Sequence, residues 1–147
     1  MIMSVMEWIS DLETVMRICV AFLLGALIGW ERESHGMSAG IRTYGAIALG
    51  ACVFGILSLS VKNADPSRIA AQIVTGVGFL GGGLIFRQEN YISGLTTAAT
   101  LWATAAVGLA VSFGFYVVSI LTALFIFLLL YLPRLAWWKK IAKNKTH

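Results

Sequence analysis

The chain has 147 residues, of which 59% are hydrophobic and only 12% charged, and its formal net charge is +4. A soluble domain carries about 25% charged residues, so this composition cannot cover a water-facing surface. It excludes a soluble enzyme, a disordered chain and a disulfide scaffold, and it predicts a small integral membrane protein.

Long stretches without charge predict five transmembrane helices, because a helix needs about 20 residues to cross a hydrocarbon core of ~30 Å. The uncharged stretch from Asn90 to Pro133 is long enough for two crossings, and Ser112-Phe113-Gly114 is its best turn. We expect an all-α fold packed through small residues. The predicted spans are residues 12–30, 43–61, 67–86, 95–111 and 115–132, within a transmembrane domain of residues 1–133 that precedes a basic cytoplasmic tail, residues 134–147.

The distribution of Lys and Arg predicts the orientation. One face collects Arg32, Arg42, Arg87 and the basic tail, and the other collects Lys62 and Arg68. The positive-inside rule therefore places the C-terminus in the cytoplasm and the N-terminus outside. The basic tail follows an apolar span without a base-reading motif, so we expect it to face anionic lipid of the bilayer and not nucleic acid.

The first span must carry charge into the edge of the membrane. Its uncharged part, residues 18–30, is too short to cross alone, so the helix must begin upstream and include Arg17. Glu13 lies four residues earlier on the same helical face, in the favourable order. Arg17 is either a snorkelling side chain with a local partner or a functional intramembrane charge.

Glycines recur at spacings that allow helices to approach closely. Gly25 and Gly29, and again Gly78 and Gly82, form G-x-x-x-G pairs. The G-x-G-x-x-G of residues 76–81 lies in the middle of an uncharged span, where a nucleotide site would need a strand before it. Three consecutive glycines near Gly82 predict either tight packing or a local helix break. The candidate packing or hinge positions are Gly25, Gly29, Gly76, Gly78, Gly81, Gly82 and Gly83.

The fourth span carries a polar stripe, since Thr96, Thr100, Thr104 and Gly108 recur every four residues. The stripe either forms hydrogen bonds between helices or lines a polar path beside the glycines of the third span.

The third span opens with Asp65-Pro66, a good helix start in which Asp65 caps and Pro66 takes the first helical position. A single exposed carboxylate cannot hold Mg²⁺ without partners, so we assign no metal site, and Asp65 is only a candidate ligand. Gln72 is expected to be the one amide buried in this span.

The polar loop from Glu31 to Thr43 contains no catalytic triad, carboxylate dyad or zinc set. We therefore expect no enzyme and no cofactor.

Four blocks, residues 25–33, 39–43, 65–83 and 94–102, resemble the signature blocks of the MgtC/SapB family in order and in spacing. The resemblance runs from about Leu23 to Gly108. It implies a multi-pass protein of the bacterial inner membrane that is linked to magnesium limitation, acid stress and virulence. Its best-studied members are thought to restrain other membrane machines, notably the F-type ATP synthase. The polar motif residues that carry over are Glu31, Arg32, Arg42, Asp65, Arg68, Gln72, Thr96 and Thr97.

The chain departs from the family pattern at two points. Longer members continue into a soluble, ACT-like C-terminal domain, so this sequence resembles a short form without it. Some members carry Asn where this chain has Thr96, so an amide-specific role does not transfer to that position.

Two functions follow as hypotheses. The first is a non-enzymatic regulator that docks its small-residue helices against a partner or a second copy of itself. The alternative is a small transporter or channel for Mg²⁺ or another small solute. Transporters usually place a carboxylate near the midplane of the membrane, and this sequence has none there, which favours the regulator.

Overall fold

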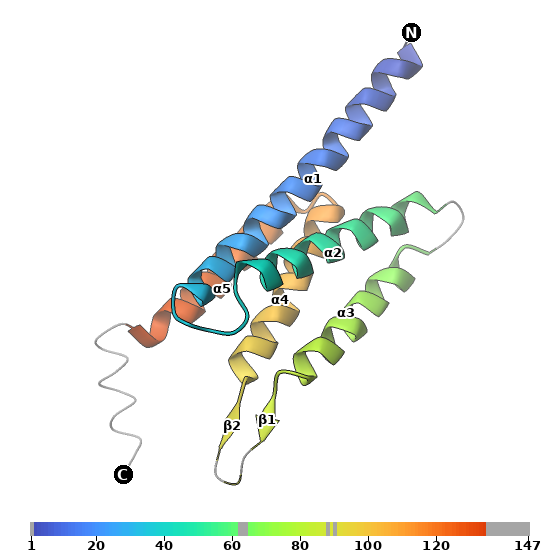
Figure 1. Cartoon of the computed structure of the whole chain (residues 1–147). Helices are drawn as coiled ribbons and strands as arrows, with labels where there is room; N and C mark the ends of the chain where they lie inside the picture. The colour runs from blue at the N-terminus through green and yellow to red at the C-terminus, as the bar shows by residue number, and fades with distance from the viewer. Residues whose placement is uncertain (1, 62–64, 88, 90, 135–147) are drawn as a thin grey trace.

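The computed structural model describes residues 2–61, 65–87, 89 and 91–134. Five helices carry the fold, and a short β-hairpin lies between the third and the fourth (Figure 1). The helices are α1 (Ile2–Glu33), α2 (Ile41–Ser60), α3 (Ser67–Gly82), α4 (Leu95–Ser112) and α5 (Tyr116–Tyr131), and the strands are β1 (Phe86–Arg87) and β2 (Ile92–Ser93).

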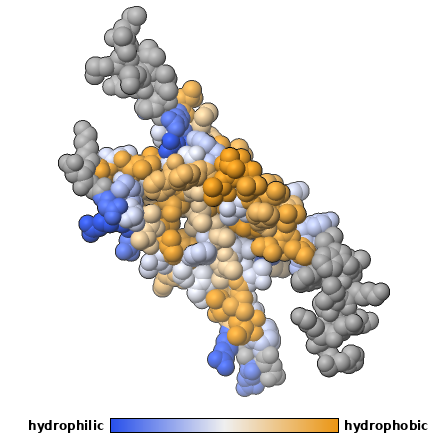
Figure 2. Space-filling model, turned by 180° about the vertical axis from the view of Figure 1, so that it is seen from behind, coloured by the Kyte–Doolittle hydropathy of each residue, from blue (hydrophilic) through white to orange (hydrophobic). Residues whose placement is uncertain are grey.

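The core lies where α1, α2, α4 and α5 meet. Ile28 of α1, Tyr44 of α2, Leu101 of α4 and Ile126 of α5 belong to one buried cluster. The N-terminal half of α1 projects beyond the other helices (Figure 1). Seen from behind, hydrophobic residues cover the middle of the molecule and hydrophilic ones gather toward its ends (Figure 2). This distribution is typical of a protein that spans a lipid bilayer.

Glycines bring the central helices together. A Cβ added at Gly25 of α1 would lie 2.6 Å from the Cβ of Ala48 on α2, and one added at Gly29 would lie 2.7 Å from the carbonyl oxygen of Gly40. A Cβ at Gly108 of α4 would overlap the carbonyl group of Ala48. The close contact of α2 with both α1 and α4 therefore depends on glycine, which has no side chain, at these positions.

Three helices are long and apolar enough to cross a membrane, namely the segment Asp11–Glu33 of α1, the whole of α2 and the whole of α4. Helix α3 and helix α5 have 16 residues each, or about 24 Å at 1.5 Å per residue. The prediction of a third span over residues 67–86 was too long by four residues. Helix α3 ends at Gly82, and Gly83 donates its backbone N–H to the carbonyl oxygen of Phe79, so the chain leaves the helix within the run of three glycines.

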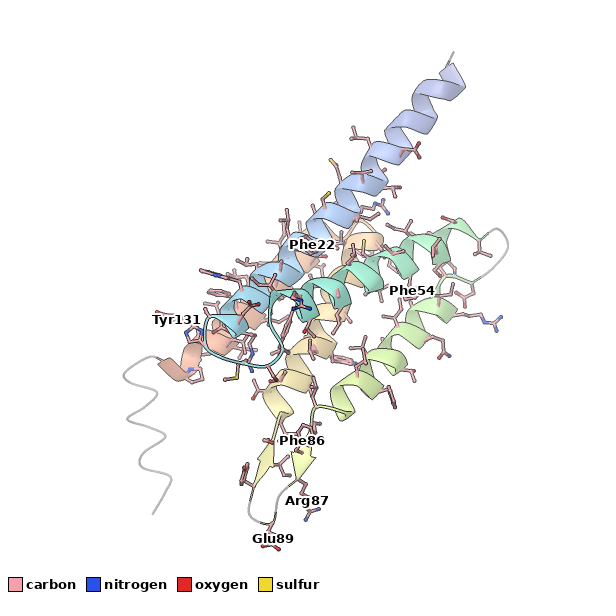
Figure 3. All side chains as sticks on the ribbon, viewed as in Figure 1. Phe22, Phe54, Phe86, Arg87, Glu89 and Tyr131 are labelled. Carbon is pink, nitrogen blue, oxygen red and sulfur yellow. The ribbon has the colours of Figure 1, made fainter. Side chains whose placement is uncertain are left out.

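The β-hairpin that follows was not predicted. Its strands pair antiparallel, with Phe86 opposite Ser93 and Arg87 opposite Ile92. It extends away from the helices, and Arg87 and Glu89 lie toward its tip (Figure 3). The hairpin thus extends the pair formed by α3 and α4 beyond the C-terminal end of α3.

Contacts bear on two alternatives that the sequence left open. The guanidinium of Arg17 lies 2.5 Å from Oε1 of Glu13, so the local partner is present, and it also donates to the carbonyl oxygen of Ser112 at the end of α4. The threonine stripe turns toward α2, where Thr100 bonds Tyr44 and Gly108 packs on Ala48. Thr100 thus makes the interhelical hydrogen bond that one interpretation predicted, whereas Thr104 donates to the carbonyl oxygen of Thr100 within α4.

Candidate functional site

The first group of motif residues lies where the end of α1 meets the start of α4. Arg32, in the last turn of α1, donates a hydrogen bond of 2.8 Å from a terminal guanidinium nitrogen to the hydroxyl of Thr97. Glu31 beside it is only 2% exposed, and its Oε1 lies 3.7 Å from Nδ1 of His35. Two blocks that are 65 residues apart in the sequence are therefore joined by one side-chain contact.

A buried hydroxyl pair lies directly beside this contact. The hydroxyl of Tyr44 on α2 is 2.6 Å from the hydroxyl of Thr100, which in turn donates to the backbone carbonyl of Thr96 at 2.9 Å. Arg32 and Glu31 both lie within electrostatic range of the Tyr44 hydroxyl. Charged and hydroxyl groups from three helices thus gather at one end of the bundle.

The side chain of Glu33, at the end of α1, bridges the loop between α1 and α2. Oε2 of Glu33 accepts the backbone N–H of Ile41 at 2.9 Å, at the N-terminus of α2. A carboxylate at this position pairs with an N–H that has no partner inside the helix and complements the positive end of the helix dipole. Gly40 is required next to it, because a Cβ there would overlap the Glu33 side chain.

The second group of motif residues lies at the start of α3. Oδ1 of Asp65 accepts the backbone N–H of Ser67 at 2.9 Å, and Oδ2 accepts the Ser67 hydroxyl at 2.7 Å. These bonds hold the pKa of the Asp65 carboxyl below its usual range, with the nearby charge of Arg68 adding to the effect. Asp65 therefore binds the first residue of α3, but the helix begins at Ser67 with Pro66 at the N-cap, one residue later than the Asp65-Pro66 start predicted.

The predicted site residues thus form two separate groups. The group at the α1–α4 junction consists of Glu31, Arg32, Thr96 and Thr97, and the group at the start of α3 consists of Asp65, Arg68 and Gln72. The exposed Arg42 lies in the first turn of α2 and joins neither group. The expectation that Gln72 is buried was wrong, since its side chain is exposed. In a membrane protein an amide on the outer face can still be covered by lipid headgroups, so polarity alone does not place it inside.

Sequence reasoning missed Tyr44 as the partner of Thr100 and the carbonyl of Ser112 as the partner of Arg17. Tyr44 follows Arg42-Thr43 in a span that reads as uniformly apolar, and no spacing rule connects it with Thr100. The Ser112 carbonyl is a backbone acceptor, which no side-chain pattern reveals. The only sequence signal for Tyr44 is its hydroxyl, because a buried Tyr usually finds a hydrogen-bond partner.

An open cavity of about 470 Å³ adjoins the first group. Arg32, Thr96 and Thr97 line one side of it, and Ile92 of β2 and Leu130 near the end of α5 are on the other. Within the described ranges, no three His, Cys, Asp or Glu side chains gather in a way that could hold a metal ion. What this arrangement can do with its own side chains is bind and orient a polar or anionic group.

A helical bundle that is apolar across its middle, with charged and hydroxyl groups gathered at the helix ends, defines a small helical membrane protein. The family model of the MgtC family matches residues 18–136, and the chain belongs to this family.

Named relatives cover most of this chain. It is 48% identical over 104 residues to Protein MgtC of Brucella abortus, which is 70% of this chain and 44% of that protein. It is 47% identical over 100 residues to Protein MgtC of Salmonella typhimurium, covering 68% and 43%. Uncharacterized protein slr0014 of Synechocystis sp. is 43% identical over 122 residues, covering 82% and 51%. The chain thus matches about half the length of these relatives, and no solved structure matches it.

Proposed function

We propose that this chain is a non-enzymatic regulator that crosses the bacterial inner membrane several times and acts by docking against other membrane proteins. The proposal rests on family membership and on one observation in the fold, the uncovered face of α3. The C-terminus lies in the cytoplasm in this proposal, as the distribution of Lys and Arg predicts.

Helix α3 carries a second face of small residues that the rest of the described chain leaves open. Ala71, Thr75, Gly78 and Gly82 recur at intervals of three or four residues, and all four are exposed. A Cβ added at Gly78 or at Gly82 would meet no atom within 4 Å. We call these four residues the outer stripe of α3.

Small residues in such a stripe favour association with another helix. In a bilayer the hydrophobic effect does not drive helices together, so close backbone packing and interhelical hydrogen bonds do. The glycines of α1 and α4 already serve this purpose inside the fold, whereas the outer stripe has no partner among the described residues. A transmembrane helix of another protein, or of a second copy of this chain, fits this requirement.

The family resemblance suggests the circumstances and one partner. Regulators of this kind are linked to magnesium limitation, acid stress and virulence, and the F-type ATP synthase is the membrane machine to test first. The alternative of a small transporter or channel is weakened, because the threonine stripe faces α2 and leaves the path beside α3 without its polar lining.

The outer stripe can be tested with a matched pair of substitutions. Gly78→Leu places a large side chain in the middle of the stripe, and Gly76→Leu places the same side chain on another face of the same helix. Both positions are open space, so both variants are expected to fold. After in-cell crosslinking and gentle-detergent purification at low Mg²⁺, Gly78→Leu should lose the co-purifying membrane partner at least tenfold, and Gly76→Leu should retain it.

Equal recovery of the partner with Gly78→Leu and with the unchanged chain would remove the outer stripe from the mechanism. Saturable uptake of Mg²⁺ by vesicles that contain only this protein would overturn the regulator and support the transporter.

A further inference from the structure

A groove runs between α2 and α3. The two helices share a loop and diverge from it (Figure 1), while Ile73 and Val77 of α3 pack with Ala105 of α4 at the base of the opening. The groove has a volume of about 570 Å³, and all of its lining is apolar except Gln72. Phe54 of α2, labelled in Figure 3, is one of its walls.

A second, polar hollow of about 660 Å³ continues this groove toward the loop. The two share Ile69 and Gln72 in their linings. The polar hollow is bounded by Asp65, Ser67 and Arg68 at the start of α3 and by Ser58 at the end of α2. Together they form one continuous depression that is charged at one end and apolar along the rest.

The charged end carries both signs. Asp65 is held as a carboxylate by its two bonds from Ser67, and the exposed guanidinium of Arg68 lies within electrostatic range of it. A group that presents a phosphate and an ammonium together complements this pair, since guanidinium binds phosphate well and carboxylate binds ammonium.

We propose that the α2–α3 groove binds one phospholipid with a zwitterionic, primary-ammonium headgroup, whose phosphate lies at Arg68, whose ammonium lies at Asp65 and one of whose acyl chains lies along Gly50 and Gly76.

The dimensions of the groove favour an acyl chain over a helix. From Arg68 to Leu80 the axis of α3 advances about 18 Å, close to the ~15 Å depth of one leaflet. A partner helix of that length and ~10 Å diameter would occupy roughly 1,400 Å³, far more than the groove holds. A flexible chain that is narrower than a helix fits between Gly50 and Gly76, where an added Cβ would meet nothing within 4 Å on either side.

Photo-crosslinking in vesicles tests the site. The full chain is reconstituted into phosphatidylethanolamine–phosphatidylglycerol vesicles that contain a trace of phosphatidylethanolamine with a diazirine in one acyl chain. After illumination, mass spectrometry should locate most adducts on α2 residues 46–54 and α3 residues 69–80. Excess phosphatidylethanolamine should compete for the site at least fivefold better than excess phosphatidylglycerol.

Two variants and one control make the test specific. Gly76→Leu fills the groove and should reduce adducts there at least fivefold, and Asp65→Asn should remove the preference for the ammonium headgroup. Gly78→Leu places the same side chain on the outer stripe and should leave the crosslinking unchanged. This pair is the reverse of the one that tests partner docking, so either proposal can fail without the other.

Several results would overturn the lipid site. These are adducts spread evenly over every membrane-facing helix, equal effects of Gly76→Leu and Gly78→Leu, a preference for the anionic phosphatidylglycerol, or a protein–protein crosslink between two copies at the groove in place of the lipid adduct.

Discussion

Arg32 of α1 donates a 2.8 Å hydrogen bond to the hydroxyl of Thr97 in the first turn of α4, and this contact holds a cation at the positive end of a helix dipole. A helix N-terminus disfavours a nearby positive charge, so the arginine depends on its side-chain partners. The Nε atom of Arg32 is buried and makes no hydrogen bond to any described residue. Loss of the Thr97 acceptor would therefore leave a partly buried guanidinium with too few partners.

We expect Thr97→Val to lower the free energy of unfolding by about 1.5–3 kcal/mol, the usual range for a hydrogen bond to a charged group. Thr96→Val is the matched control, because Thr96 is the neighbouring threonine with an exposed side chain, and it should cost less than about 0.5 kcal/mol. Reversible unfolding in mixed detergent micelles, followed by circular dichroism, measures both. Similar losses for the two variants would show that the Arg32–Thr97 bond contributes nothing specific.

The glycines are of two kinds, those packed tightly against another helix and those in open space, and substitution by alanine distinguishes them. Gly108→Ala must push its Cβ into the carbonyl of Ala48 on α2, and overpacking of this kind costs about 1–3 kcal/mol. Gly76→Ala adds a Cβ in open space and should be neutral or stabilising by up to about 1 kcal/mol, since alanine favours a helix over glycine. The same unfolding titration compares them. A destabilised Gly76→Ala variant would contradict the open groove between α2 and α3.

The sequence predicted three of the five helices within two residues at each end, and the reason is local. Helices α2, α4 and α5 fill uncharged stretches whose ends are marked by charge, glycine or proline, and the structure places them at Ile41–Ser60, Leu95–Ser112 and Tyr116–Tyr131. The end of α3 was misplaced, because apolar residues continue past Gly82 into β1 and hydropathy does not distinguish a short strand from a further helical turn.

The candidate site could be predicted in its residues but not in its contacts. A four-residue period fixes that Thr100, Thr104 and Gly108 share a face of α4, yet the rotation of α4 in the bundle decides that they face α2. The contact of Thr100 with Tyr44 depends on that rotation. In the same way, the separation of Arg32 from Asp65 into two groups is a property of helix arrangement, which spacing along the chain does not encode.

The bonds between Asp65 and Ser67 at the start of α3 predict a pH dependence. The pKa of Asp65 is lowered in the folded chain, mainly by the Ser67 hydroxyl and then by its backbone N–H. A lowered folded pKa means that the contribution of the ionised group is fully present above the unfolded value of about 3.9 and is lost as the pH falls through the folded pKa.

Ser67→Ala removes the largest of these causes, so the pKa of Asp65 should rise toward its usual value and this contribution should be lost at a higher pH. Carbon-13 NMR of the labelled carboxyl group in micelles follows the titration directly. Ser93→Ala, a serine in β2 that bonds only the hairpin backbone carbonyl of Phe86 in the described contacts, should leave the Asp65 midpoint where it is. An unchanged midpoint in Ser67→Ala would contradict the bonds between Asp65 and Ser67.

Arg17 should matter more than its ion-pair partner, because it holds two parts of the fold together. Its guanidinium donates to the carbonyl oxygen of Ser112 at the C-terminus of α4, where the helix dipole favours a cation and the last carbonyls have no partner within the helix. The Glu13 side chain is 49% exposed and that of Arg17 is 21% exposed. We expect Arg17→Gln to lower the free energy of unfolding by about 1.5–3 kcal/mol and Glu13→Gln to lower it by less than about 1 kcal/mol.

Amide hydrogen exchange at Gly114 and Phe115, whose N–H groups bond Val111 and Ala110 in the α4–α5 turn, should accelerate in Arg17→Gln and stay the same in Glu13→Gln. If the two variants lose equal stability and exchange alike, Arg17 acts only as the exposed half of a helix-surface pair, and the turn is held by its backbone bonds alone.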